Sequence, residues 1–178
     1  MTQTFVPAPR TADVARIGGP GEVLGEDQVR AFVRDQLAGA DLDGRSVCVV
    51  VPDATRSCPL PLLLSTVHDA LHGRVSRLTV LIALGTHAAM DEPALAVHLG
   101  YPVGELAGTD PGTAVLNHEF WKPDTFADVG TIPADRLAEL SGGMLRQDVG
   151  VRLNRAVVEH DVTLIVGSAL AASPLCGP

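Results

Sequence analysis

The chain has 178 residues, of which 46 % are hydrophobic and 19 % charged, which suits one domain of ordinary size and argues against general disorder. Its net charge of −8 and its 3 % aromatic content argue against nucleic-acid binding. We find no apolar run long enough to span a membrane, no secretory signal, and three separated cysteines (Cys48, Cys58 and Cys176), as expected for a reduced, cytoplasmic protein.

The predicted elements alternate between helix and strand. Residues 1–25 are rich in Pro and Gly and are expected to form an extended arm with at most one short strand. Hydrophobic periodicity then predicts helices over Glu26 to Leu37, Leu60 to Val75 and Val151 to Val158. Asp91 as an N-cap and Gly100 as a stop predict a further short helix over Glu92 to Leu99. Hydrophobic periodicity also predicts buried strands over Ser46 to Val51, Leu78 to Leu84 and Val162 to Val166, and a weaker strand over Thr113 to Leu116. Residues 120–148 fit neither pattern clearly.

This order of elements predicts an α/β fold. Continuous β-branched runs such as residues 46–51 are typical of strands buried on both faces of a parallel sheet. Strands that alternate with helices give a mostly parallel sheet with helices on both faces, in Rossmann-like layers. We expect this domain to cover residues 26–167 and to be followed by a divergent or truncated tail over 168–178.

Polar side chains follow each predicted strand where the strand ends. Asp53, Thr55 and Arg56 follow the first strand, His87 follows the second, and His118 follows the third. In an open α/β sheet, ligands bind outside the carboxyl ends of the strands. We therefore expect these residues to share one edge of the sheet.

The residue types at this edge indicate proton chemistry beside an anion. The guanidinium of Arg56 is always charged and binds carboxylates or phosphates in a fork. The imidazole of His87 exchanges a proton near neutral pH, and His118 is either a second such group or a residue that orients its loop. Asp53 would fix either Arg56 or the tautomer of a histidine.

A structural interpretation competes with the functional one. An Asp-x-Thr sequence after a strand is about as often a turn and helix cap, here formed by Thr55 or Ser57. A lone histidine in such a loop is more often a hydrogen-bonded structural residue. The coincidence of three such loops at one edge favours a site.

The same segments resemble a known family over roughly residues 20–167. They are VPDATR at 51–56, LIALGTH at 81–87, NHE at 117–119, and Asn154-Arg155 before a strand ending IVG at 165–167. Their order and spacing are similar to those of the N-terminal domain of the nickel-pincer lactate racemase family.

The resemblance implies a two-domain isomerase that racemises or epimerises a small 2-hydroxy acid. Its cofactor would be a nickel-pincer nucleotide that accepts and returns a hydride, while two histidines act as base and acid. His87 matches the first catalytic histidine and Arg56 matches the arginine that binds the substrate carboxylate. Asp53 and Thr55 match the loop beside the substrate and the cofactor phosphate. His118 is grouped with these cofactor-binding residues without an individual role.

The sequence departs from the family pattern after residue 167. The family's second histidine, the lysine bonded to the pincer and the histidine ligand of nickel have no counterparts in residues 168–178. We therefore expect a truncated member that is inactive by itself. The alternatives are a non-catalytic domain that binds anions or 2-hydroxy acids, and a half-enzyme completed by a C-terminal domain in trans.

Overall fold

The computed structural model describes residues 15–101 and 113–167. Most of the predicted arm, and the whole predicted tail over 168–178, lie outside the described residues. Residues 15–25 contain neither helix nor strand, and the first regular element, α1, covers Glu26–Ala38.

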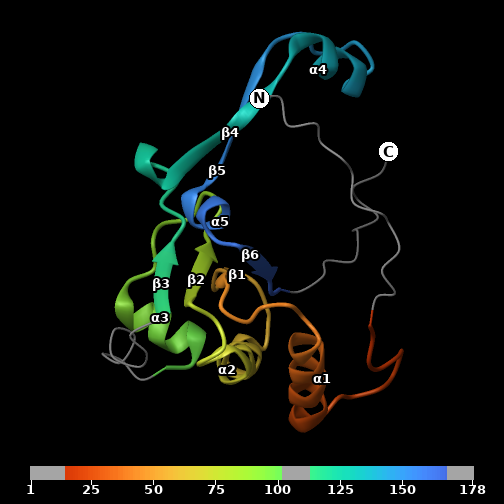
Figure 1. The fold of residues 1–178 in the computed structure, drawn as a ribbon, viewed down its shortest axis with the longest axis vertical. Coiled ribbons are helices and arrows are strands. Elements are labelled where there is room, and N and C mark those ends of the chain that lie inside the picture. The colour runs from red at the N-terminus through yellow and green to blue at the C-terminus, as the bar shows by residue number, and fades with distance from the viewer. Residues whose placement is uncertain (1–14, 102–112, 168–178) are drawn as a thin grey trace.

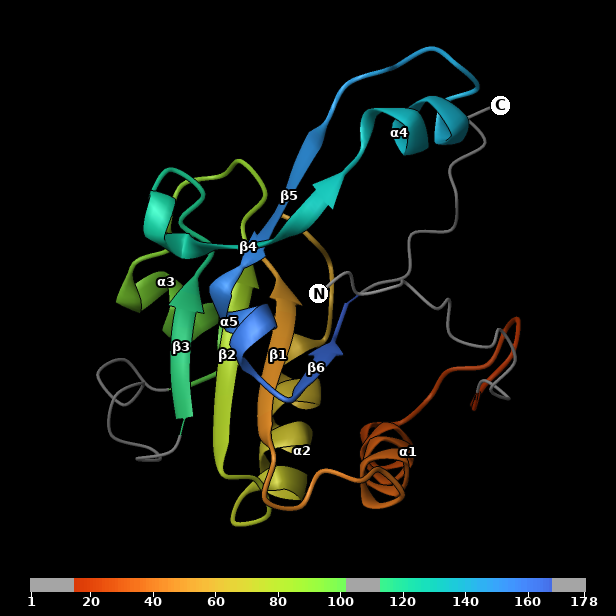
Figure 2. The ribbon, with the colours of Figure 1, turned by 45° about the horizontal axis from the view of Figure 1, so that its top comes forward.

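The main sheet has four parallel strands. They are β1 (Ser46–Pro52), β2 (Arg77–Ala83), β3 (Thr113–Asn117) and β6 (Val162–Ile165), and they lie side by side in the order β3-β2-β1-β6 (Figure 2). In this register Val50 of β1 is paired with Leu81 of β2 on one side and with Ile165 of β6 on the other. Because the strands are parallel, their carboxyl ends meet at one edge.

Helices α1, α2 (Leu60–Leu71) and α3 (Glu92–Leu99) pack against one face of this sheet. Alternate strand residues point to that face and form the main core together with apolar side chains of the three helices. The core includes Val47, Val49, Val51, Leu60, Leu64, Leu71, Leu78, Val80, Ile82 and Leu95. Burial of this apolar surface is the main stabilising term of the fold.

The second face carries the short helix α5 (Arg155–Glu159). Ala156 of this helix is buried with Cys48 and Leu81 of the sheet. Helices therefore lie on both faces, and the predicted α/β class with a mostly parallel sheet is confirmed. The second face is less completely covered, since Leu116 is 44 % exposed and Ile165 is 83 % exposed.

The prediction of a helix over 151–158 is confirmed for residues 155–158 and wrong for residues 151–154. Residues Val149–Asn154 form β5, and α5 starts only at Arg155. The side chain of Asn154 accepts a hydrogen bond from the Ala156 N–H at 2.9 Å and so caps the helix at this point. Val149, Val151 and Leu153 also fit the period of two of a strand, which the helical interpretation overlooked.

The ambiguous segment 120–148 supplies the partner of β5. It contains the 3₁₀ turn η1 (Pro123–Thr125), β4 (Phe126–Ile132) and α4 (Ala134–Leu140). Strands β4 and β5 pair antiparallel, and this ribbon leads away from the main sheet to α4 (Figure 1).

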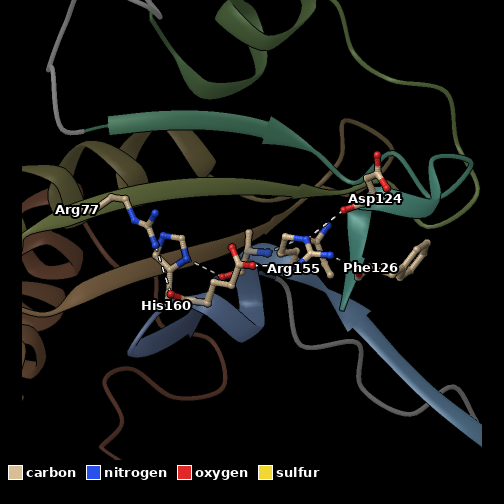
Figure 3. A network of polar contacts seen from close by, with 8 residues as sticks. Arg77, Asp124, Phe126, Arg155 and His160 are labelled. Atoms are coloured by element: carbon tan, nitrogen blue, oxygen red, sulfur yellow. Dashed lines mark hydrogen bonds and ion pairs between the residues drawn. The ribbon is translucent and has the colours of Figure 1, made fainter. Parts of the chain in front are cut away.

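Arg155 ties the base of the ribbon to α5. Its guanidinium donates to the carbonyl of Asp124 at 3.3 Å and to that of Phe126 at 2.9 Å, and pairs with Glu159 at 3.0 Å (Figure 3). At the other end of α5, a ring nitrogen of His160 lies 2.8 Å from Thr79 Oγ1 on β2. The network thus fixes α5 between the sheet and the ribbon.

The strand β6 differs from the expectation of a strand buried on both faces. It is an edge strand of four residues that pairs only with β1 within the described part of the chain, which explains its partial exposure. None of the helices in residues 15–101 and 113–167 combines the length and apolar character needed to cross a bilayer.

Candidate active site

The loops that follow β1 and β2 converge at the carboxyl edge of the sheet. They line an open cleft of about 530 Å³ together with the end of β6. Its lining includes Asp53, Thr55, Arg56, Gly85, Thr86, His87, Ile165 and Gly167. The aspartate, guanidinium and imidazole that the sequence placed on separate loops therefore share one cleft.

Asp53 is buried at the floor of the cleft and accepts several hydrogen bonds. It is 5 % exposed, and its Oδ1 accepts from the Thr55 N–H at 3.0 Å and from the Thr55 hydroxyl at 2.5 Å. Its Oδ2 is hydrogen-bonded to His87 Nδ1. Burial alone would raise the pKa of Asp53, but the bonds from Thr55 and His87 outweigh burial, so the pKa is lowered. Asp53 is therefore ionised at neutral pH.

The charge of Asp53 determines the tautomer of His87. An ionised carboxylate only accepts hydrogen bonds, so Nδ1 of the neutral imidazole must carry the proton in this pair. The other ring nitrogen, Nε2, is then free of a proton and able to accept one. The His87 side chain is 56 % exposed, so this nitrogen is accessible to a ligand in the cleft.

The loop after β1 is organised by Asp53 and not by a helix cap. Thr55 donates its hydroxyl to Asp53, the Arg56 N–H donates to the Asp53 carbonyl at 3.2 Å, and α2 begins after Pro59 with no side-chain cap. The predicted capping of α2 by Thr55 or Ser57 is therefore wrong. A ring nitrogen of His98 lies 2.8 Å from the Pro52 carbonyl, a contact with the end of β1 that sequence reasoning missed.

The loop that carries His87 runs from the end of β2 to α3. It turns at Gly85, whose φ of +60° suits glycine, and the His87 N–H donates to the Leu84 carbonyl at 3.0 Å. Farther along, the side-chain amide of Asn117 bonds both backbone groups of Met90. Asn117 belongs to the NHE segment at 117–119, but no role was predicted for its side chain.

Arg56 supplies the positive charge of the cleft. Its side chain lines the cleft, and within the described residues its guanidinium has no carboxylate partner. A guanidinium without an ion pair is able to bind a carboxylate or phosphate through two parallel hydrogen bonds.

His118 is not among the residues that line the cleft. Its Nδ1 lies 2.9 Å from Asn154 Nδ2, and its ring meets the ring of Phe126 edge-on with 5.6 Å between centroids. The amide nitrogen donates, so Nδ1 of His118 accepts. The structure thus places His118 at the base of the β4–β5 ribbon, apart from Asp53 and His87.

The described residues do not form a nickel site. A protein metal centre uses several His, Cys or carboxylate donors that surround one point. No group of three such side chains with that arrangement occurs in residues 15–101 and 113–167. For a nucleotide that carries a metal, the described residues therefore offer a group that can bind the phosphate, Arg56, but no set of donors for the metal.

Fold and cleft together define an α/β domain of the class that holds small ligands at the carboxyl ends of parallel strands. Within that class, the chain belongs to the lactate racemase N-terminal domain family, which matches residues 31–171.

One solved structure similar to this chain is that of a protein from Thermotoga maritima. The two share 26 % sequence identity with a TM-score of 0.65, over 80 % of this chain and 33 % of the other. This chain thus spans about a third of the length of that relative. No curated protein matches the chain.

Proposed function

We propose that the cleft binds a 2-hydroxy acid and forms one half of a site for its racemisation or epimerisation. The observation that carries this proposal is the pairing of buried Asp53 with exposed His87 beside the Arg56 guanidinium, which has no carboxylate partner among residues 15–101 and 113–167. The family to which the chain belongs supports the same reaction class.

Arg56 would bind the carboxylate of the substrate. A planar guanidinium and a carboxylate form two parallel hydrogen bonds, which fix orientation as well as position. The hydroxyl on the neighbouring carbon would then face His87, because Arg56 and His87 line the same cleft.

His87 would accept the hydroxyl proton at Nε2. Its Nδ1–H remains bonded to Asp53, which stabilises the imidazolium that forms. General acid–base assistance of this kind contributes about 10²–10⁴-fold to a rate. Loss of the hydroxyl proton prepares the carbinol carbon for release of its hydride to an acceptor.

Inversion at the carbinol carbon needs an acid–base group on each side of a planar keto acid. His87 is the one imidazole that lines the cleft within residues 15–101 and 113–167. We therefore propose that the second group comes from a C-terminal domain, in the same chain or in trans. A nickel-pincer nucleotide would also need its metal donors from there. On this proposal the 178 residues alone give no turnover.

A non-catalytic anion-binding domain is the second candidate. The open cleft and the Arg56 guanidinium in it favour this candidate, since binding of a carboxylate needs neither His87 nor a second domain. The two candidates differ in whether the cleft recognises the hydroxyl of the ligand.

Calorimetry with the 178-residue chain tests both candidates. We expect D- or L-lactate to bind about 2–10-fold more tightly than propionate, because one hydrogen bond to the hydroxyl contributes about 0.5–1.5 kcal/mol. Arg56→Ala should abolish binding of all these acids, whereas Arg34→Ala on the exposed face of α1 should not.

His87→Ala should remove the preference for lactate and leave the binding of propionate. Equal affinity for lactate and propionate in the wild type would support the anion-binding domain instead. Absence of binding, or binding that survives Arg56→Ala, would exclude both candidates.

A further inference from the structure

We propose that Asn117 is a positioning residue that holds the His87 loop against Asp53. The inference rests on the proposed function, because it concerns the geometry of the acid–base pair described above. It assigns a role to a side chain that lies on β3 and is not among the residues that line the cleft.

The Asn117 side chain binds the loop through two hydrogen bonds. Its Oδ1 accepts from the Met90 N–H at 3.1 Å, and its Nδ2 donates to the Met90 carbonyl at 3.0 Å. The amide thus pairs with Met90 as a backbone peptide group of a neighbouring strand would. Asparagine provides this donor and acceptor in one short side chain.

The backbone around Asn117 is itself fixed to the sheet. Asn117 is the last residue of β3 and is in register with Ile82 of β2. The next residue, His118, donates its N–H to the Ile82 carbonyl at 3.0 Å. The two bonds to Met90 therefore connect the loop to the rigid strands and not to another loop.

Backbone anchoring matters because packing does not fix the His87 ring. The side chain is 56 % exposed, and its hydrogen bond to Asp53 joins two separate loops. The loop is held before His87 by the turn at Leu84 and after it by Asn117 at Met90. Loss of the second anchor would free the loop backbone and weaken the pairing of Nδ1 with Asp53.

The tautomer of His87 reports this role directly. With ¹⁵N-labelled histidine in alkaline buffer, at a pH where the ring signals no longer change, the two ring nitrogens show which one carries the proton. In the wild type we expect the proton on Nδ1. In Asn117→Ala we expect the ring signals to move toward the Nε2-protonated tautomer that free histidine prefers.

Asn154→Ala is the matched control. Asn154 is also a partly buried asparagine whose side chain binds a backbone group, but it caps α5 and bonds His118 instead of the loop that carries His87. It should lose stability without changing the His87 signals. Asn117→Asp keeps the acceptor for the Met90 N–H and loses the donor, so an intermediate shift is expected.

Unchanged His87 signals in a folded Asn117→Ala or Asn117→Asp protein would overturn the proposal. Rapid hydrogen exchange of the Met90 amide in the wild type would overturn it as well, even if neither variant folded. A wild-type ring with its proton on Nε2 would instead refute the Asp53–His87 pair and with it the proposed function. None of these measurements needs a ligand. The Asn117 variants test the positioning role and the wild-type tautomer tests the Asp53–His87 pair, so failure of this inference can be distinguished from failure of the proposed function.

Discussion

Substitution of Asp53 by Asn tests the pair at the centre of the cleft. The amide has nearly the same shape as the carboxylate and can still accept from Thr55, but it has no charge. Its NH₂ group is a donor, so His87 can satisfy it only by leaving Nδ1 without a proton. The substitution should therefore destabilise the fold and shift the imidazole proton to Nε2.

The cost follows from the contacts of this carboxylate. A hydrogen bond to a charged group contributes about 1.5–3 kcal/mol. Because the His87 ring is exposed to water, its hydrogen bond to Asp53 contributes less than a buried one would. We therefore expect Asp53→Asn to lower the free energy of unfolding by about 2 kcal/mol, near the lower end of this range. For a domain of this size that corresponds to a fall in Tm of about 4–8 °C.

The loss should depend on pH with a defined sign. The folded pKa of Asp53 is lowered, so its charge contributes stability that is fully present above the unfolded value of about 3.9. That contribution disappears as the pH falls through the folded pKa. The gap between wild type and Asp53→Asn should thus be widest near neutral pH and should narrow in acid.

Urea unfolding followed by circular dichroism over a pH series measures this gap. Asp35→Asn on the exposed side of α1 is the matched control and should leave stability within about 0.5 kcal/mol. An Asp53→Asn loss that is absent at neutral pH, or equally large in acid, would refute the reasoning.

Two further substitutions, each with its own control, test the packing of the helices of the main core by urea unfolding. Gly100 ends α3 with a φ of +80°, and a Cβ there would lie 2.6 Å from Pro61 Cβ, so Gly100→Ala should cost about 3 kcal/mol. Gly73 has a similar φ, but a Cβ there would meet nothing within 4 Å, so Gly73→Ala should cost only about 1–2 kcal/mol. Equal costs for the two substitutions would contradict the predicted clash with Pro61. Leu71→Ala removes a fully buried side chain and should cost about 2–5 kcal/mol, whereas Val97→Ala, 80 % exposed, should be nearly neutral.

Local patterns in the sequence were sufficient for most of the main sheet. The β-branched run at 46–51 and the apolar run at 78–84 correspond to β1 and β2 to within one or two residues. The Asp91 cap and Gly100 stop gave the bounds of α3, because both signals depend on adjacent backbone groups. Parallel pairing followed from the alternation of strands with helices.

The β4–β5 ribbon was not predictable in the same way. Its strands contain no fully buried residue, so no strong hydrophobic pattern marks them. Their pairing depends on contacts between residues far apart in sequence, from Phe126 with Asn154 to Ile132 with Val149. A segment such as 151–158, which fits two periodicities, can be assigned only when its partner strand is known.

For the candidate site, the sequence by itself determined the chemical groups and the edge of the sheet at which they lie. Strand ends are local features, and parallel pairing brings them together. Only the tertiary structure decided which groups meet: Asp53 bonds His87, Asn117 bonds Met90, and His118 lies apart at the ribbon. Hydrogen bonds depend on tenths of an ångström and on direction, and these are fixed by the packing of the whole domain and not by the order of residues.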